Sequence, residues 1–100
     1  MSKRQEHIAI AYDKQGRVIS IGRNSYIRSN KTQRKYARLV GKPDSVFLHA
    51  EIDALVRAKG RQIHSMFVSR ITPSGYAMSK PCEICEQALK DFGVKHLRWT

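Results

Sequence analysis

Residues 81–99, PCEICEQALKDFGVKHLRW, decide the fold class of this chain. The apolar side chains of residues 81–92 recur at intervals of three and four, a spacing typical of a helix with one buried face. A proline at position 81 suits the first turn of such a helix, and Gly93 is a typical helix end. Residues 94–99 then predict a strand. The helix residues expected to face inward are Ile84, Ala88, Leu89 and Phe92.

The stretch before this helix supplies another strand. Residues 63–71, IHSMFVSRI, contain β-branched and aromatic side chains, whereas residues 72–80 include a Pro-Ser-Gly turn signal and predict irregular structure. Two strands joined through a helix usually lie parallel in one sheet. The sequence from 63 to 99 therefore predicts a parallel βαβ unit.

The N-terminal part adds a hairpin and two helices. The predicted elements are strands at 7–12 and 17–22, a turn at 13–16, a loop at 24–31 and helices at 32–40 and 47–59. The residues expected to form the buried stripe of the second helix are Ile52, Leu55 and Val56. We therefore predict an α/β fold, with a mixed four-stranded sheet, helices packed on it, and a single domain over residues 1–100.

Composition limits the classes of function. A length of 100 residues with 41% apolar content suits one ordinary core. No apolar run approaches the roughly 18 residues that a membrane-spanning helix needs. Residues 1–6 are charged and lack the apolar stretch of a secretory signal. We therefore expect a cytoplasmic protein with no membrane partner.

The chain is strongly basic, with 19 Lys and Arg against 8 Asp and Glu and a net charge of +11. The imbalance is local, because residues 22–42 contain basic residues and no acidic one. Such a segment is either a solvated surface or a contact surface for phosphates. Tyr26 and Tyr36 lie within it and offer rings on which bases stack. If the protein binds single-stranded nucleic acid, we expect segment 22–42 to contact it.

Two short motifs carry the candidate chemistry. His49-Ala50-Glu51 and Pro81-Cys82-Glu83-Ile84-Cys85 each lie at the start of a predicted helix. Cys82 and Cys85 are three residues apart, so both sulfurs lie on one helix face, where the helix N-terminus favours thiolates. One imidazole and two thiolates leave the fourth position of a tetrahedral zinc site open to water. Glu51 is then placed to take a proton from that water without binding the metal.

Each motif alone has an ordinary explanation. A single histidine is commonly a core or surface residue, and a Cys-x-x-Cys pair in a cytosolic chain is a metal clip or a redox centre. The combination is more specific, because H-x-E followed by P-C-x-x-C is the signature of zinc deaminases. The pattern therefore favours a catalytic zinc site over a structural or chance arrangement.

With these residues, the chain resembles the cytidine deaminase-like superfamily. The likeness covers the hairpin, both motif helices and the strands of the βαβ unit. The short H-A-E motif is most similar to that of deoxycytidylate and tRNA adenosine deaminases, above all to small phage-type members. The resemblance implies a three-layer fold truncated after the fourth strand. It also implies Zn²⁺ held by His49, Cys82 and Cys85, with Glu51 as the proton shuttle.

The resemblance also implies substrate contacts and an oligomer. Members usually continue with a fifth strand and a further helix, so a homo-oligomer that protects the sheet edge is expected. The substrate-binding residues implied by the resemblance are Asn24 for the sugar or base, Ala50 for the base, and Ser79 and Lys80 in the pocket lining. The basic segment adds Arg28 and Lys31 as phosphate-binding candidates beside Lys80. The candidates for a stacking wall are Tyr26, Tyr36 and Trp99.

We therefore predict a hydrolase that converts cytosine to uracil in a free nucleoside or nucleotide, such as deoxycytidine or its monophosphate, and releases ammonia. The alternative is a deaminase that acts on a base in single-stranded DNA or RNA, which the charge of +11 favours. A zinc-stabilised binding module without activity is a third hypothesis, although a structural metal would not require Glu51. The expected location is the cytoplasm, that of the host if the chain is phage-encoded.

Overall fold

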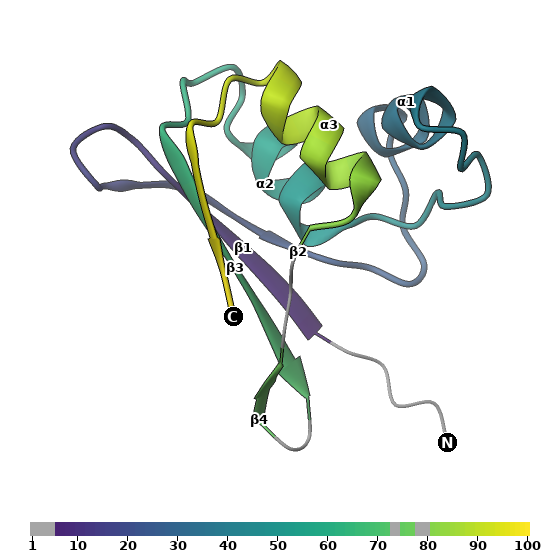
Figure 1. Ribbon diagram of the computed structural model, residues 1–100, viewed down its shortest axis with the longest axis horizontal. Helices are drawn as coiled ribbons and strands as arrows, with labels where there is room; N and C mark the ends of the chain where they lie inside the picture. The colour runs from purple at the N-terminus through teal and green to yellow at the C-terminus, as the bar shows by residue number, and fades with distance from the viewer. Residues whose placement is uncertain (1–5, 73–74, 78–80) are drawn as a thin grey trace.

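The computed structural model of the chain describes residues 6–72, 75–77 and 81–100. The strands are β1 (Glu6–Tyr12), β2 (Val18–Arg23), β3 (Ser65–Thr72), β4 (Gly75–Ala77) and β5 (His96–Trp99). The helices are α1 (Lys31–Leu39), α2 (Ala50–Arg57) and α3 (Glu83–Asp91). Figure 1 shows the helices grouped together on one side of the strands. No helix among the described residues is long and apolar enough to cross a membrane.

The sheet is mixed and four strands wide, as the sequence predicts. β1 lies in its middle and pairs antiparallel with β2 and with β3. The other edge of β3 is shared, because β5 pairs with Ser65–Val68 and β4 pairs with Arg70–Thr72. The strands β3 and β5 pair in parallel, and the chain that connects them contains α3. The predicted βαβ unit is therefore confirmed. The short strand β4 is an addition, because residues 72–80 predict only irregular structure.

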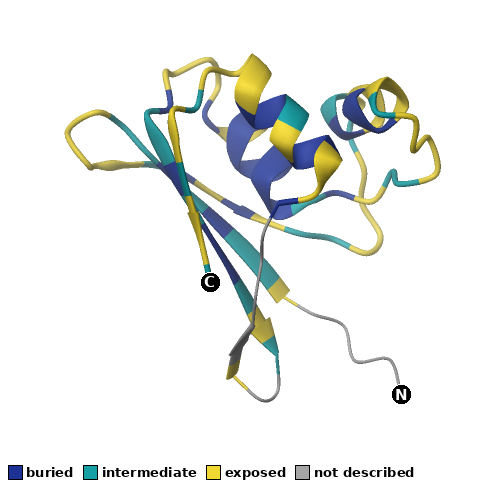
Figure 2. Cartoon of the chain, viewed as in Figure 1, coloured by how far each residue is buried: buried dark blue, intermediate teal, exposed yellow. Residues whose placement is uncertain are grey.

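Successive side chains along the strands alternate in burial, and this alternation distinguishes the two faces of the sheet. Ala9, Ala11, Met66 and Val68 face the helices and are buried, whereas Ile10 and Phe67 between them are half-buried. In Figure 2 the buried surfaces of α2 and α3 face this side of the sheet. The described elements therefore form one helix layer on one sheet layer. The sheet face on which a third layer would lie carries the exposed side chains of Val18 and Ile21.

The helix α2 approaches the hairpin closely because β2 has small residues there. The Ser20 hydroxyl donates to the Ala54 carbonyl oxygen at 2.8 Å. At Gly22 a Cβ would overlap the Ala50 carbonyl oxygen and the Ala54 amide nitrogen, and it would lie 2.9 Å from the Ala54 Cα. All three atoms are backbone, so no side-chain rotation relieves the clash. A glycine at this position therefore fixes the depth of α2 on the sheet.

Gly22→Ala is expected to lower the free energy of unfolding by about 3 kcal/mol, because overpacking here displaces a whole helix. Chemical denaturation of the two proteins measures this difference. Gly16→Ala is the control, because its Cβ meets no atom within 4 Å and its φ of +83° adds only about 1–2 kcal/mol of backbone strain. Equal losses in the two variants would contradict the close approach of α2.

Three details of the helix predictions are corrected. The second helix begins at Ala50 rather than 47, because hydrogen bonds to other segments hold the backbone of the preceding residues outside the helix. Val56 is 42% exposed and does not join Ile52 and Leu55 in the core. Phe92 is 41% exposed at the C-terminal end of α3, where its ring lies tilted against that of Tyr36 with a centroid separation of 6.5 Å. The predictions that Val56 and Phe92 are buried are therefore wrong.

Candidate active site

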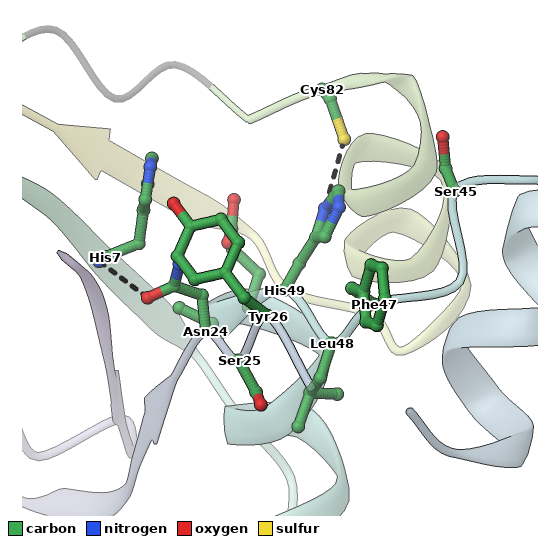
Figure 3. Close-up of a pocket in the computed structure, with 11 residues that line it drawn as sticks. His7, Asn24, Ser25, Tyr26, Ser45, Phe47, Leu48, His49 and Cys82 are labelled. Atoms are coloured by element: carbon green, nitrogen blue, oxygen red, sulfur yellow. Dashed lines mark hydrogen bonds between the residues drawn. The ribbon is translucent and has the colours of Figure 1, made fainter. Parts of the chain in front are cut away.

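The site lies where the N-termini of α2 and α3 converge. His49 is the N-cap residue of α2 and Cys82 is that of α3, and both have extended backbones. Side chains at this position usually accept a hydrogen bond from the first turn, so Ser, Thr, Asp and Asn are preferred there. Neither His49 nor Cys82 makes such a bond. Their side chains point toward each other instead, as Figure 3 shows.

Three donor atoms come together between the helices. The Nδ1 atom of His49 lies 3.3 Å from the Cys85 Sγ and 3.4 Å from the Cys82 Sγ. All three ligand atoms lie within 4.8 Å of one another. At tetrahedral angles, zinc–ligand bonds of about 2.3 Å to sulfur and about 2.0 Å to nitrogen separate these two atom types by about 3.5 Å. The donor set therefore fits a zinc ion with three protein ligands.

The two thiols form an electrostatically asymmetric pair. Hydrogen bonding from Cys85 to Cys82, with a further contribution from His49, lowers the pKa of Cys82 to about 3. The same hydrogen bond and burial raise the pKa of Cys85 well above its usual value. Hydrogen bonding to Cys82 likewise raises the pKa of His49. The thiolate form that zinc prefers is therefore favoured at Cys82 even before a metal ion binds.

Glu51 lies beside this group but is not one of its members. It occupies the first turn of α2, and only 5% of it is exposed. Burial raises the pKa of the Glu51 carboxyl. A carboxyl group that is desolvated next to an open metal position is suited to accept a proton from water and return it to a leaving group.

The metal-binding group opens into a cavity of about 360 Å³. This volume lies in the range of about 300–1,000 Å³ found for small-molecule sites. The cavity is lined by His7, Asn24, Ser25, Tyr26, Ser45, Phe47, Leu48, His49, Ala50, Glu51 and Cys82. In Figure 3 the rings of Tyr26 and Phe47 lie on two sides of His49. The arrangement therefore offers a flat ligand aromatic surfaces next to the metal-binding group.

Asn24 and Ala50, the residues expected to contact the sugar and the base, both line this cavity. The Asn24 Oδ1 accepts a hydrogen bond from the His7 backbone N–H at 2.9 Å, and the Asn24 N–H donates to the His7 carbonyl at 3.3 Å. Arg28, in the loop before α1, and Lys31, the first residue of α1, are exposed and lie outside the lining. Ser79 and Lys80 lie outside the described residues.

The three candidate stacking residues differ in position. Tyr26 lines the cavity. Tyr36 is a buried core residue whose hydroxyl donates to the Asp91 Oδ2 at 3.0 Å, so its prediction as a stacking wall is wrong for this chain. Trp99 is exposed on β5 and is not part of the lining.

The five lining residues that were not predicted from the sequence are His7, Ser25, Ser45, Phe47 and Leu48. Two of them, His7 and Phe47, carry rings. His7 faces the cavity from β1, and burial together with Arg70 lowers its pKa. Phe47 belongs to the segment before α2, outside every helix and strand, although the sequence places it in the helix. No local motif marks either residue. Only the three-dimensional arrangement of the hairpin and α2 brings them to the metal-binding group.

A mixed sheet with helices on one face and a His/Cys/Cys group at two helix N-termini defines the class of zinc-dependent deaminases. The chain belongs to the family described as cytidine and deoxycytidylate deaminase zinc-binding region, whose model matches residues 3–100. Zinc is therefore its cofactor, and His49, Cys82 and Cys85 form the group that could hold it. A search of curated proteins found no match to this chain.

Proposed function

We propose that the chain hydrolyses the exocyclic amine of cytosine in a free nucleoside or nucleotide, giving uracil and ammonia. The observation that carries the proposal is the buried carboxyl of Glu51 beside the His/Cys/Cys group, in the lining of the same cavity. A purely structural metal site would need neither the carboxyl nor the cavity. The family match supports deaminase chemistry in general.

The protein residues divide the work of the reaction. When bound, zinc would supply a water molecule whose pKa is low enough for it to lose a proton near neutral pH. Glu51 accepts that proton as the water oxygen bonds to the ring carbon that carries the amine, and it passes the proton to the ring nitrogen, which receives the electron pair of the opened carbon–nitrogen double bond. Glu51 then transfers the proton of the new hydroxyl group to the amine nitrogen, the bond from this nitrogen to the ring carbon breaks, ammonia leaves, and the ring carbon becomes a carbonyl. Because Glu51 is almost fully buried, bulk water does not compete for that proton.

Substrate orientation falls to the remaining lining residues. We assign the sugar or base contact to Asn24, whose position is fixed by its two bonds with the His7 backbone. Ala50 is fully buried and is assigned to the base edge, where its small side chain leaves room. Tyr26 and Phe47 are assigned to the base faces, where aromatic rings stack favourably.

Ammonia release by the zinc-loaded protein tests this proposal. The substrates are cytidine, deoxycytidine, their monophosphates and a cytosine-containing oligonucleotide, and Glu51→Ala is the control. Turnover of a small substrate that disappears in the variant is the expected result. Silence on every cytosine substrate, with zinc confirmed to be bound, would overturn the proposal.

One observation favours a second candidate, a deaminase that acts on single-stranded nucleic acid. Lys31, Arg34, Lys35 and Arg38 follow the i, i+3, i+4, i+7 spacing along α1, so they lie on one face of that helix. All four are exposed, and none forms an ion pair with a carboxylate of the described residues. The opposite face carries the buried Gln33, Tyr36 and Ala37. The α1 stripe, these four cations, thus offers a row of charges to a phosphate backbone.

Replacing the α1 stripe with glutamines is expected to separate the two candidates. If an oligonucleotide is the substrate, its binding constant should depend less on salt, with the log–log slope reduced by up to about 3. Fluorescence anisotropy at several salt concentrations measures the slope. Glutamines at four other exposed cations give a control of equal net charge: Lys14, Lys59, Arg61 and Lys95. Equal slopes in both variants would remove the support for the second candidate.

A further inference from the structure

A buried amide side chain connects α1 to the metal-binding group. Gln33 is 0% exposed, although glutamine is usually a surface residue. Its Oε1 accepts a hydrogen bond from the His49 backbone N–H at 3.1 Å, and its Nε2 donates to the Ser45 carbonyl oxygen at 3.0 Å. Its own backbone N–H is bonded to the side chain of Asn30, the N-cap of α1, at 2.7 Å. Each polar atom of this side chain therefore has a protein partner.

These bonds act on the segment 45–49, which forms one wall of the cavity. The segment belongs to no helix or strand, so its backbone groups need partners elsewhere. Leu48 is bonded on both sides to the loop after β2, through the Ser25 N–H and the Arg28 carbonyl, each at 2.9 Å. Gln33 bonds the two ends of the segment, at Ser45 and at His49. The wall is thus clamped between that loop and α1.

The two hydrogen bonds from Gln33 to Ser45 and His49 require a side-chain amide of the length of glutamine. The Ser45 carbonyl needs a donor and the His49 N–H needs an acceptor, and glutamine presents both on one planar group. Loss of the side chain would leave two partly buried backbone groups without these partners. At the same time His49 would lose the contact that fixes its backbone at the N-terminus of α2. The orientation of its ring toward the two sulfurs depends on that backbone position.

We propose that Gln33 is a positioning residue of the zinc site. By fixing the His49 backbone it holds Nδ1 opposite the Cys82 and Cys85 sulfurs, and through Ser45 it also holds the cavity wall that carries Phe47. The proposal concerns metal binding, so it does not depend on which base the protein deaminates.

Gln33→Met tests the proposal, because methionine keeps the length and buried volume but removes both hydrogen bonds. Removing an outer partner of a metal ligand typically costs 10–100-fold in metal affinity, and we expect a loss of about that size. Zinc affinity is measured by competition with a chelator. The cobalt-substituted protein provides a spectrum that reports ligand geometry, and the Gln33→Met spectrum should differ from that of the wild type.

Tyr36→Phe is the matched control on the same helix. It removes the bond from the buried Tyr36 hydroxyl to Asp91, which links α1 to α3 and does not touch His49. We expect a comparable loss of thermal stability but a zinc affinity within about threefold of the wild type, since no metal ligand loses a partner. If Gln33→Met also keeps the wild-type zinc affinity and cobalt spectrum, Gln33 serves only to pack α1 and the proposal is overturned.

Gln33→Glu provides a second test if Gln33→Met does not fold. This variant keeps the side-chain shape and an acceptor for the His49 N–H, but it faces the Ser45 carbonyl with an oxygen. We expect a zinc affinity between those of the wild type and Gln33→Met. An affinity equal to the wild type, together with an unchanged cobalt spectrum, would show that the link to Ser45 contributes nothing to the zinc site. Deaminase activity enters neither test, so failure here is separate from failure of the proposed function.

Discussion

Glu51→Gln is expected to bind zinc as tightly as the wild type and to lose turnover by about 10²–10⁴-fold, the usual contribution of a positioned acid–base group. Glutamine keeps the shape of the side chain, and Glu51 is not among the three metal-binding residues. It cannot accept a proton from the attacking water or return one to the leaving nitrogen. Steady-state ammonia release measures the rate, and metal analysis of the same sample measures zinc.

The control for this prediction is Asp53→Asn. Asp53 is the other buried carboxylate of α2, and its Oδ2 accepts hydrogen bonds from the Arg23 N–H at 3.0 Å and the Arg57 Nε at 2.9 Å. The bond from Arg23 holds the helix to β2, the bond from Arg57 lies within α2, and Asp53 is not part of the cavity lining. We expect a loss of stability with kcat largely retained. Retention of turnover by Glu51→Gln would instead assign proton transfer to another group.

The sequence predicts most of the fold because its strongest signals are local. The turn at 13–16 defines the hairpin, and the alternation of strand, helix and strand after residue 63 defines the parallel pair β3 and β5. The start of α2 is missed because residues 45–49 are fixed by Gln33 and the loop after β2, which lie far away in sequence. Helical spacing alone cannot register such a competing interaction. The strand β4 is missed for a different reason, because the Pro-Ser-Gly signal after β3 predicts irregular structure, whereas the chain turns back after β3 and pairs with its end.

The sequence predicts the metal-binding group because its residues belong to local motifs, whereas it misses cavity-wall residues that only packing brings together. His49 and Glu51 belong to one short motif and the two cysteines to another, and each motif lies at the start of a helix. His7 and Phe47 reach the site only through the packing of β1 and the segment before α2. Tyr36 shows the opposite error, because it is predicted to belong to the site but lies in the core. Its proximity to basic residues favours a surface role, whereas its helical phase with Gln33 and Ala37 places it in the core.

The site also explains a stability cost in the fold. Two helices begin at residues that do not cap them, and a cap typically contributes about 1 kcal/mol. Binding of zinc by the same two residues offsets this loss, because a ligand that binds only the folded state stabilises it. Metal binding and the packing of α2 against α3 are therefore linked in this chain.

Cys85→Ser is expected to abolish this linkage. In the wild type, zinc at 100–1,000 times its dissociation constant should add about 3–4 kcal/mol to stability and raise Tm by about 10–30 °C. Cys85 is fully buried between the helices, and serine is a poor zinc ligand of nearly the same size, so the variant should fold but show almost no zinc-dependent shift. Thermal unfolding with zinc and with a chelator measures the shift, and Glu51→Gln should retain it. A full shift in Cys85→Ser would mean that the ion is held without Cys85, and the assignment of the three ligands would then be wrong.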